Sequence, residues 1–149
     1  IRADMQNILL DLQNELHKTI VFITHDLDEA LKIGDRIAIL RDGLIVQDSN
    51  PQEIILKPAD KYVSDFIKDI NRARVIKAKS IMTKSTFKVK GAISINHDMV
   101  LEDVLQEITK NPGAIISVTN DSKKIVGKIS IEELLNGIKR PDTKTKNYT

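Results

Sequence analysis

The chain has no cysteine and no tryptophan among its 149 residues, and only 3% of its residues are aromatic. Without cysteine it forms neither disulfides nor thiolate metal sites, and this composition fits a reducing compartment. No hydrophobic run approaches the ~20 residues that a membrane-spanning helix requires, and the amino end reads as an amphipathic segment rather than a signal peptide. Any membrane association is therefore expected to come through a partner protein.

A strong excess of one charge is also absent, because 23 basic and 21 acidic side chains leave a formal net charge of +2. The stretch from Arg72 to Lys90 nevertheless carries seven basic residues and no acidic one. It has a single aromatic residue, Phe87, rather than the interleaved aromatic residues of single-strand binders, so we expect no nucleic-acid partner. The stretch is open to three interpretations: a site for a regulatory nucleotide, a contact with an anionic lipid surface, or a solvated linker.

The amino-terminal half has the pattern of an α/β unit. Apolar residues at helical spacing predict a helix over residues 2–17. The β-branched run at residues 19–24 shows no polar alternation, which predicts a strand buried on both faces of a parallel sheet. Asp26 and Glu29 have the spacing of a capping box and predict a second helix over residues 26–33.

Turn and cap residues organise the next segment. The Asp-Gly pair between the apolar runs 35–40 and 44–46 predicts a β-hairpin, and we expect Asp35 and Arg36 to pair locally. The sequence Asn-Pro-Gln-Glu at residues 50–53 then predicts a helix start, and apolar spacing predicts a further helix over residues 62–70.

A second, smaller unit follows the basic stretch. Its apolar pattern predicts the order β-α-β-β-α, in the segments 93–95, 100–108, 114–118, 125–129 and 131–138. His97 falls in the loop after the first of these strands, where we expect it to be exposed. At 41% hydrophobic residues, the chain has enough apolar material for two small cores.

His25 ends the apolar run of residues 19–24 and precedes the second helix. Ligands of open α/β sheets bind beyond the carboxyl ends of the strands, and backbone amides at a helix start favour phosphate. An imidazole there can donate to an anionic oxygen or orient a water, so the site chemistry could be phosphoryl transfer. From spacing alone, a histidine at this position is more often a cap or a surface residue.

A family resemblance favours the catalytic interpretation of His25. The stretch "IVFITHDLDEALKIGDRIAILRDGLIVQDSNPQEI" resembles the switch-loop region of an ABC-transporter ATPase. With "KPADKYVSDFI" and "RVIKAKSIM", the chain is most similar to the ATPase subunit of glycine betaine/proline importers, whose ATPase domain is followed by CBS sequence. The resemblance implies an α/β fold: the C-terminal part of a P-loop ABC ATPase domain followed by a small α+β CBS-type module.

The resemblance also implies site residues and cofactors. His25 matches the switch histidine, which contacts the γ-phosphate of ATP and holds the attacking water, and the whole protein would use ATP and Mg²⁺. The P-loop, the signature motif and the Walker B strand are absent from these residues, and no metal ligand is expected among them. Because phosphoryl transfer needs those parts, we expect this chain alone neither to bind ATP tightly nor to hydrolyse it.

The CBS resemblance points to Ser130 and Glu133. In "GKISIEEL", Ser130 stands at the hydroxyl position of the ribose contact with an adenosine-type nucleotide, and Glu133 stands where aspartate is usual. The same two residues have the spacing of a capping box for the last helix, which is the interpretation we favour. One CBS module buries too little surface alone, so pairing with the module of a second subunit is expected.

These expectations assign a role to each segment. The domains are the C-terminal part of the ABC ATPase at 1–71, a basic linker at 72–77, a CBS-type module at 78–139 and a disordered tail at 140–149. The resemblance implies a homodimer of ATPase subunits on the cytoplasmic face of the membrane, bound to a permease and working indirectly with a substrate-binding protein in osmoprotection. The alternatives are a non-catalytic nucleotide-sensing CBS protein and an ABC ATPase for another solute.

Overall fold

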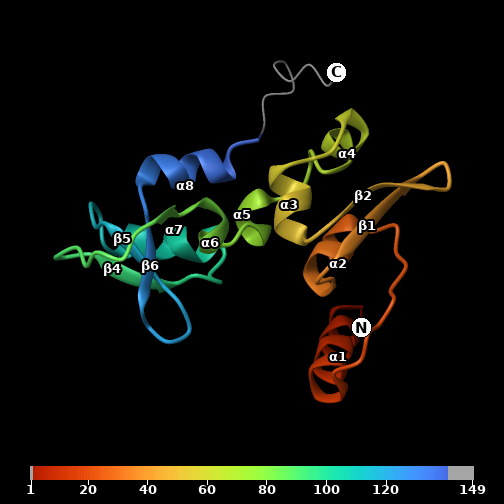
Figure 1. Ribbon diagram of the computed structural model, residues 1–149, viewed down its shortest axis with the longest axis horizontal. Coiled ribbons are helices and arrows are strands. Elements are labelled where there is room, and N and C mark those ends of the chain that lie inside the picture. The colour runs from red at the N-terminus through yellow and green to blue at the C-terminus, as the bar shows by residue number, and fades with distance from the viewer. Residues whose placement is uncertain (1, 141–149) are drawn as a thin grey trace.

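The computed structural model describes residues 2–140 and shows two parts joined by short helices (Figure 1). The first part comprises α1 (Arg2–Leu16), α2 (Leu27–Ile33), β1 (Ile37–Arg41), β2 (Leu44–Ser49), α3 (Pro51–Leu56) and α4 (Lys61–Phe66). The second part follows α5 (Arg72–Val75) and α6 (Ala78–Ile81), and comprises β3 (Thr83–Lys84), β4 (Ile93–Asn96), α7 (Leu101–Lys110), β5 (Ile116–Thr119), β6 (Ile125–Ile129) and α8 (Ile131–Ile138). Of the tail predicted to be disordered, residues 141–149 lie outside the described residues. None of the described helices is long and apolar enough to cross a membrane.

The predicted caps set the helix starts of the first part. Asp26 accepts a hydrogen bond from the amide of Glu29 at 3.2 Å, which starts α2. Asn50 accepts from the amide of Glu53 at 3.0 Å, and Pro51 fills the first position of α3. Each cap satisfies one of the amides that have no partner within the helix.

The predicted hairpin is confirmed. Asp42 and Gly43 both have positive φ, 51° and 78°, as the two central residues of a type I′ turn require. Arg36 pairs across the hairpin with Asp48, at 2.7 and 2.9 Å, so the expected pairing of Arg36 with Asp35 was wrong. The cross-strand carboxylate offers the guanidinium both oxygens, which gives a bidentate contact.

The strand predicted over residues 19–24 is not formed, so this prediction was wrong. Residues 17–26 contain no helix or strand, and the side chains of Val21 and Ile23 are 85% and 91% exposed. A strand needs a neighbour to accept and donate its backbone hydrogen bonds. Within residues 2–140, every strand belongs either to the hairpin or to the second sheet, and none of them pairs with this segment.

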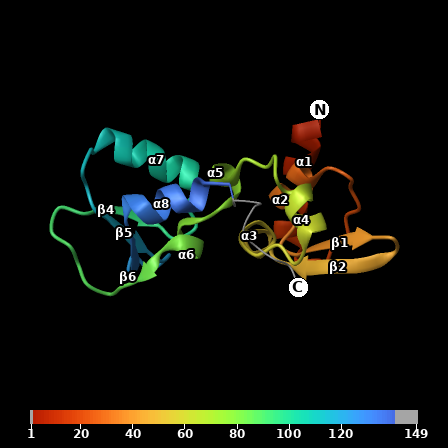
Figure 2. The ribbon, with the colours of Figure 1, turned by 90° about the horizontal axis from the view of Figure 1, so that it is seen from above.

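The second part is a four-stranded sheet with two helices on it. Its strand order is β3-β6-β5-β4, in which β4 and β5 are parallel and the other pairs are antiparallel. Helices α7 and α8 contact each other and lie together on one side of the sheet (Figure 2). The predicted order β-α-β-β-α is therefore confirmed, and β3 adds an edge strand to it.

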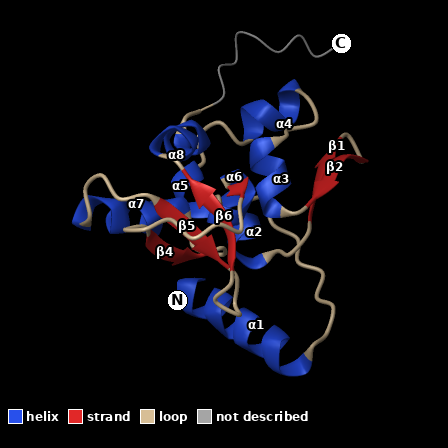
Figure 3. Ribbon diagram, turned by 60° about the vertical axis from the view of Figure 1, so that its left-hand side comes forward, coloured by secondary structure: helices blue, strands red, loops and turns tan. Residues whose placement is uncertain are grey.

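Buried apolar side chains run through both parts. The side chains that are fully buried, with less than 2% exposure, are Ile54, Ile55, Ile76, Leu101, Ile116, Ile129, Leu134, Val63, Val104 and Val118. Ile76 follows α5 and lies between the two parts in the chain, while Ile54 and Ile55 belong to α3. Figure 3 shows α3, α5 and α6 at the centre of the molecule, with the hairpin and the second sheet on opposite sides of them.

Candidate functional site

His25 lies on the bend between the irregular segment 17–24 and helix α2, with its side chain exposed. Asp26 follows as the N-cap of α2, so the bend is fixed on its carboxyl side by the start of a helix. Within the described residues, no hydrogen bond or ion pair holds the imidazole of His25. The structure therefore presents this ring at the surface, with both of its nitrogens available to a ligand.

Hydrogen bonds on both sides of His25 fix the bend. The amide of Asp26 donates to the hydroxyl of Thr24 at 3.0 Å, and the same hydroxyl donates to the carboxylate of Glu29 at 2.6 Å. Glu29 is buried, with only 8% of its surface exposed. A capping box needs two bonds, and only one is present. The amide of Glu29 donates to the side chain of Asp26, but the amide of Asp26 donates to Thr24 and not to Glu29, so the predicted capping box is confirmed in part. Thr24 is thus bonded directly to the buried carboxylate, and the amide of Asp26 is linked to it through the hydroxyl of Thr24.

Helix α1 supports the same carboxylate from the other side. The amide group of Gln6 donates to Glu29 at 3.1 Å, and Lys32 donates to the side-chain oxygen of Gln6 at 3.1 Å. These contacts join α1 to α2 across 23 and 26 residues of sequence. The bend that carries His25 is therefore supported from α1 as well as from α2.

Ser130 and Glu133 form the reciprocal capping box of α8 that their spacing predicts. The amide of Ser130 donates to Glu133 at 2.7 Å, and the amide of Glu133 donates to the hydroxyl of Ser130 at 3.1 Å. The hydroxyl of Thr83 also donates to Glu133, which ties α8 to the edge strand β3. The structural role of this pair is therefore confirmed, whereas the ribose contact stays a prediction.

Gly127, which opens the same motif, also has a structural role. A Cβ atom at this position would lie 2.4 Å from the sulfur of Met82 and 3.0 Å from the carbonyl oxygen of Thr83. A larger side chain here would have to displace the side chain of Met82 and would crowd the backbone of β3, so glycine suits this close approach.

The capping box of Ser130 and Glu133 predicts that the stability of the fold depends on pH. The hydrogen bonds from the Ser130 amide and then from the Thr83 hydroxyl hold the pKa of Glu133 below its usual range. The resulting stabilisation is complete above the ordinary pKa of a glutamate, about 4.3, and is lost as the pH falls through the lower pKa of the folded state. In urea titrations between neutral pH and pH ~3, we expect Glu133→Gln to flatten the acid loss of stability. Glu132→Gln is the control, and an equal effect of both variants would contradict the assignment.

His97 is not exposed as expected. Its side chain is only 23% exposed, and its Nε2 atom lies 3.5 Å from a carboxylate oxygen of Asp121 and 3.8 Å from one of Asp98. Asp98 is bound by Lys79 at 2.6 Å and Lys77 at 3.4 Å. The hydrogen bond from Lys79 is the main reason that the pKa of Asp98 lies below its usual range. Part of the basic stretch is thus neutralised by acidic residues close in space.

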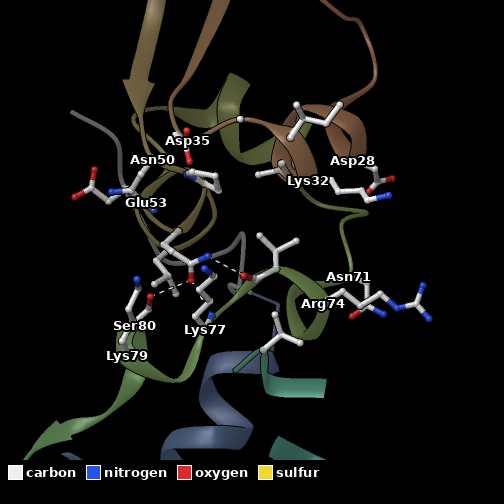
Figure 4. Close-up of a pocket in the computed structure, with 18 of the residues that line it drawn as sticks. Asp28, Lys32, Asp35, Asn50, Glu53, Asn71, Arg74, Lys77, Lys79 and Ser80 are labelled. Atoms are coloured by element: carbon white, nitrogen blue, oxygen red, sulfur yellow. Dashed lines mark hydrogen bonds between the residues drawn. The ribbon is translucent and has the colours of Figure 1, made fainter. Parts of the chain in front are cut away.

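A cleft of about 1170 Å³ separates the two parts. Figure 4 shows Asn50 and Glu53 on one wall and Lys77, Lys79 and Ser80 on the other. Its charged lining residues have both signs: Lys32, Lys57, Arg74, Lys77 and Lys79 against Asp28, Asp35, Glu53 and Asp69. This cleft therefore has no strong preference for an ion of either charge. Among residues 2–140, no group of three histidine, aspartate or glutamate side chains is placed to hold a metal ion.

Sequence reasoning missed three polar residues that the structure places at key contacts. Gln6 supports the bend of His25, while Gln52 and Arg72 connect the two parts of the molecule. Arg72 is buried, although its position in a basic stretch suggested a linker residue. The only signal for Gln52 was its place next to the cap of α3. All three contacts depend on residues that are distant in the sequence.

Comparison with known proteins gives a consistent set of relatives. The chain is 37% identical over 138 residues to the trimethylamine N-oxide transport system ATP-binding protein of Pelagibacter ubique, covering 93% of this chain and 40% of that protein. It is 38% identical to the glycine betaine transport ATP-binding protein of Bacillus subtilis, covering 91% of this chain and 34% of the relative. It is 55% identical over 83 residues to the glycine betaine/carnitine transport ATP-binding protein of Listeria monocytogenes, covering 56% of this chain and 21% of the relative.

No protein-family model matches the chain. The chain spans between 21% and 40% of the length of the three relatives above. Two of the three matches nevertheless cover more than nine-tenths of the chain and therefore include both of its parts. The predicted resemblance to an ABC ATPase subunit is confirmed by these matches. The chain is a homologue of the ATP-binding subunits of quaternary-amine ABC importers, matched to part of their length.

Proposed function

We propose that this chain forms part of the ATP-hydrolysing subunit of an ABC importer for glycine betaine or proline-type osmoprotectants. The observation that carries the proposal is the similarity, across both parts of the chain, to proteins named as ATP-binding subunits for glycine betaine and trimethylamine N-oxide transport. The exposed histidine on a supported bend, in the sequence Thr-His-Asp, fits such a subunit.

In this proposal His25 contacts the γ-phosphate of ATP and holds the attacking water. The residues of this chain do not fit a complete Mg²⁺–ATP site, because no described cluster of acidic or histidine side chains offers a metal position. The phosphate-binding loop and the magnesium ligands must come from other residues of the whole protein. We therefore expect no ATP hydrolysis by residues 1–149 alone.

The proposed assembly contains two ATPase subunits bound to a transmembrane permease on the cytoplasmic face of the membrane, with a substrate-binding protein acting indirectly. Closure of the two subunits around ATP would drive the permease between its two states. The support for this arrangement is the family relationship, since transport ATPases act on a separate membrane component. The exposed apolar residues of α1 and of segment 20–23 add support, because surfaces of this kind are usually covered in a larger assembly.

Residues 78–139 are proposed to be a regulatory CBS-type module that pairs with the same module of a second subunit. The order of its elements and its small sheet support this assignment. Its ligand would be an adenosine-type nucleotide near Ser130 and Glu133, or it would respond to ionic strength. Deleting residues 76–149 from the full-length protein should abolish the response of transport to salt or nucleotide. An unchanged response in this variant would refute the regulatory role.

The test of the proposed function is transport by the full-length protein. Proteoliposomes that contain this subunit and its permease should accumulate labelled glycine betaine only when ATP is enclosed with the ATPase. Choline, carnitine and proline, offered as competitors, would define the substrate. Absence of accumulation, together with adenosine-nucleotide binding by residues 78–139, would favour the alternative of a non-catalytic sensor.

A further inference from the structure

Arg72 connects the ends of two helices that belong to different parts of the molecule. Its Nε atom donates to the carbonyl oxygen of Gly137 in α8 at 3.1 Å, and its Nη1 atom donates to the carbonyl oxygen of Ile55 in α3 at 2.9 Å. Both carbonyls lie in the last turn of their helix, where no further amide of the helix can bond to them. One guanidinium therefore caps two carboxyl-terminal helix ends.

The charge of Arg72 suits this position. The residue is only 9% exposed, and none of the carboxylates within residues 2–140 forms an ion pair with it. Helix carboxyl ends carry partial negative charge, so two of them together stabilise a buried cation. The fixed fork of a guanidinium also reaches two acceptors at once, which a single ammonium group does less well.

Gln52 makes a second connection from α3. Its side-chain oxygen accepts hydrogen bonds from the amide of Lys77 at 2.8 Å and from the hydroxyl of Ser80 at 2.9 Å. Its side-chain nitrogen donates to the carbonyl oxygen of Val75 at 2.7 Å. Figure 4 shows Lys77 and Ser80 facing α3 across the edge of the cleft. All three bonds go from α3 to the segment that includes the start of α6.

That segment is itself bonded to the start of α7. The amide of Ala78 donates to the carbonyl oxygen of Met99 at 2.8 Å, and the amide of Leu101 donates to that of Ile76 at 2.9 Å. Lys77 and Val100 form the β-bridge between these two bonds. A continuous set of hydrogen bonds therefore runs from α3 to α7, while Arg72 joins α3 to α8.

From these contacts we infer that Arg72 and Gln52 form a two-point joint that fixes the carboxyl-terminal part in one orientation against α3 and the hairpin. Two separate points of attachment prevent rotation about every axis except the line that joins them. A displacement of α8 that keeps the bond between Arg72 and Gly137 must carry Arg72 with it, and through the bond to Ile55 it then reaches α3. The joint does not depend on the proposed transport function, because its support lies in contacts within this chain.

The orientation of the two parts can be measured with a pair of spin labels in the full-length protein. Leu44 and Lys110 are exposed positions on the hairpin and on α7. Residues 1–149 contain no cysteine, and any cysteine elsewhere in the full-length protein is first replaced by serine. Labels at Leu44→Cys and Lys110→Cys should give one narrow distance distribution in the otherwise unchanged protein. A second pair, Lys110→Cys with Lys128→Cys, reports whether the carboxyl-terminal part keeps its own fold.

Arg72→Gln should abolish the single narrow distribution of the first pair and leave the second pair unchanged. The matched control is Arg74→Gln, because Arg74 lies on the same helix but is 68% exposed and pairs with Glu102 on the surface. If Arg72→Gln does not fold, Gln52→Ala tests the other attachment point. Its control is Gln47→Ala, whose hydrogen bonds stay within the first part.

The joint is overturned if Gln52→Ala and, where it folds, Arg72→Gln keep the narrow distribution of the unchanged protein. It is also overturned if the Arg74 and Gln47 controls broaden the distribution as much, since the orientation would then not depend on these two residues. Broadening in Arg72→Gln or Gln52→Ala, with both controls and the second label pair unchanged, supports it.

Discussion

Replacing His25 by alanine in the full-length protein should lower the rate of ATP hydrolysis by about 100-fold or more and leave ATP binding close to that of the unchanged protein. The imidazole lies on an exposed bend, and no other described residue depends on it for a hydrogen bond. Its removal should therefore slow the hydrolysis step without disturbing the fold. Phosphate release and nucleotide binding, measured on the same preparation, check both halves of the expectation.

The control for this substitution is His17→Asn. His17 is also exposed, but it lies after the end of α1 with a positive φ of 50°, a conformation that asparagine tolerates. We expect this variant to hydrolyse ATP at the unchanged rate. Hydrolysis by His25→Ala at the rate of the unchanged protein would refute the switch role.

Leu101→Ala should lower the free energy of unfolding of the carboxyl-terminal part by about 2–5 kcal/mol. Leu101 is fully buried at the first position of α7, and its side chain packs tightly against Gly137 of α8. Truncation removes apolar contacts where α7, α8 and α6 meet and leaves a cavity that the backbone cannot easily close. The shift of the urea midpoint measures the loss.

Leu135→Ala is the matched control, because Leu135 is 56% exposed on α8. Its truncation is expected to change the free energy of unfolding by no more than about 0.5 kcal/mol. Equal losses for the two variants would show that α7 and α8 do not share the core described above.

The sequence predicted the turns and helix starts well, because these are determined by contacts between residues close together in the chain. Asp42 and Gly43 determine a type I′ turn, and Ser130 with Glu133 determines the start of α8, through contacts between residues only a few positions apart. The prediction failed where distant residues decide. The segment 19–24 has the composition of a buried strand, but a strand also needs a partner, and the described residues supply none.

The candidate site was predictable only in part, for the same reason. His25 could be identified from its motif, but its support by Gln6 and Glu29 requires α1 to lie against α2. The burial of Arg72 likewise depends on two helix ends, at Ile55 and Gly137, that the sequence does not bring together. Composition alone therefore classed Arg72 with the surface residues of a basic linker.

The most direct test of the central claim is phosphate release from ATP by the purified full-length protein, compared with the same assay on residues 1–149. We predict Mg²⁺-dependent release by the full-length protein and none by the 149 residues. The assay is repeated in the presence of the permease and with adenosine nucleotides bound to residues 78–139. The assignment as a transport ATPase would be contradicted if the full-length protein released no phosphate under these conditions.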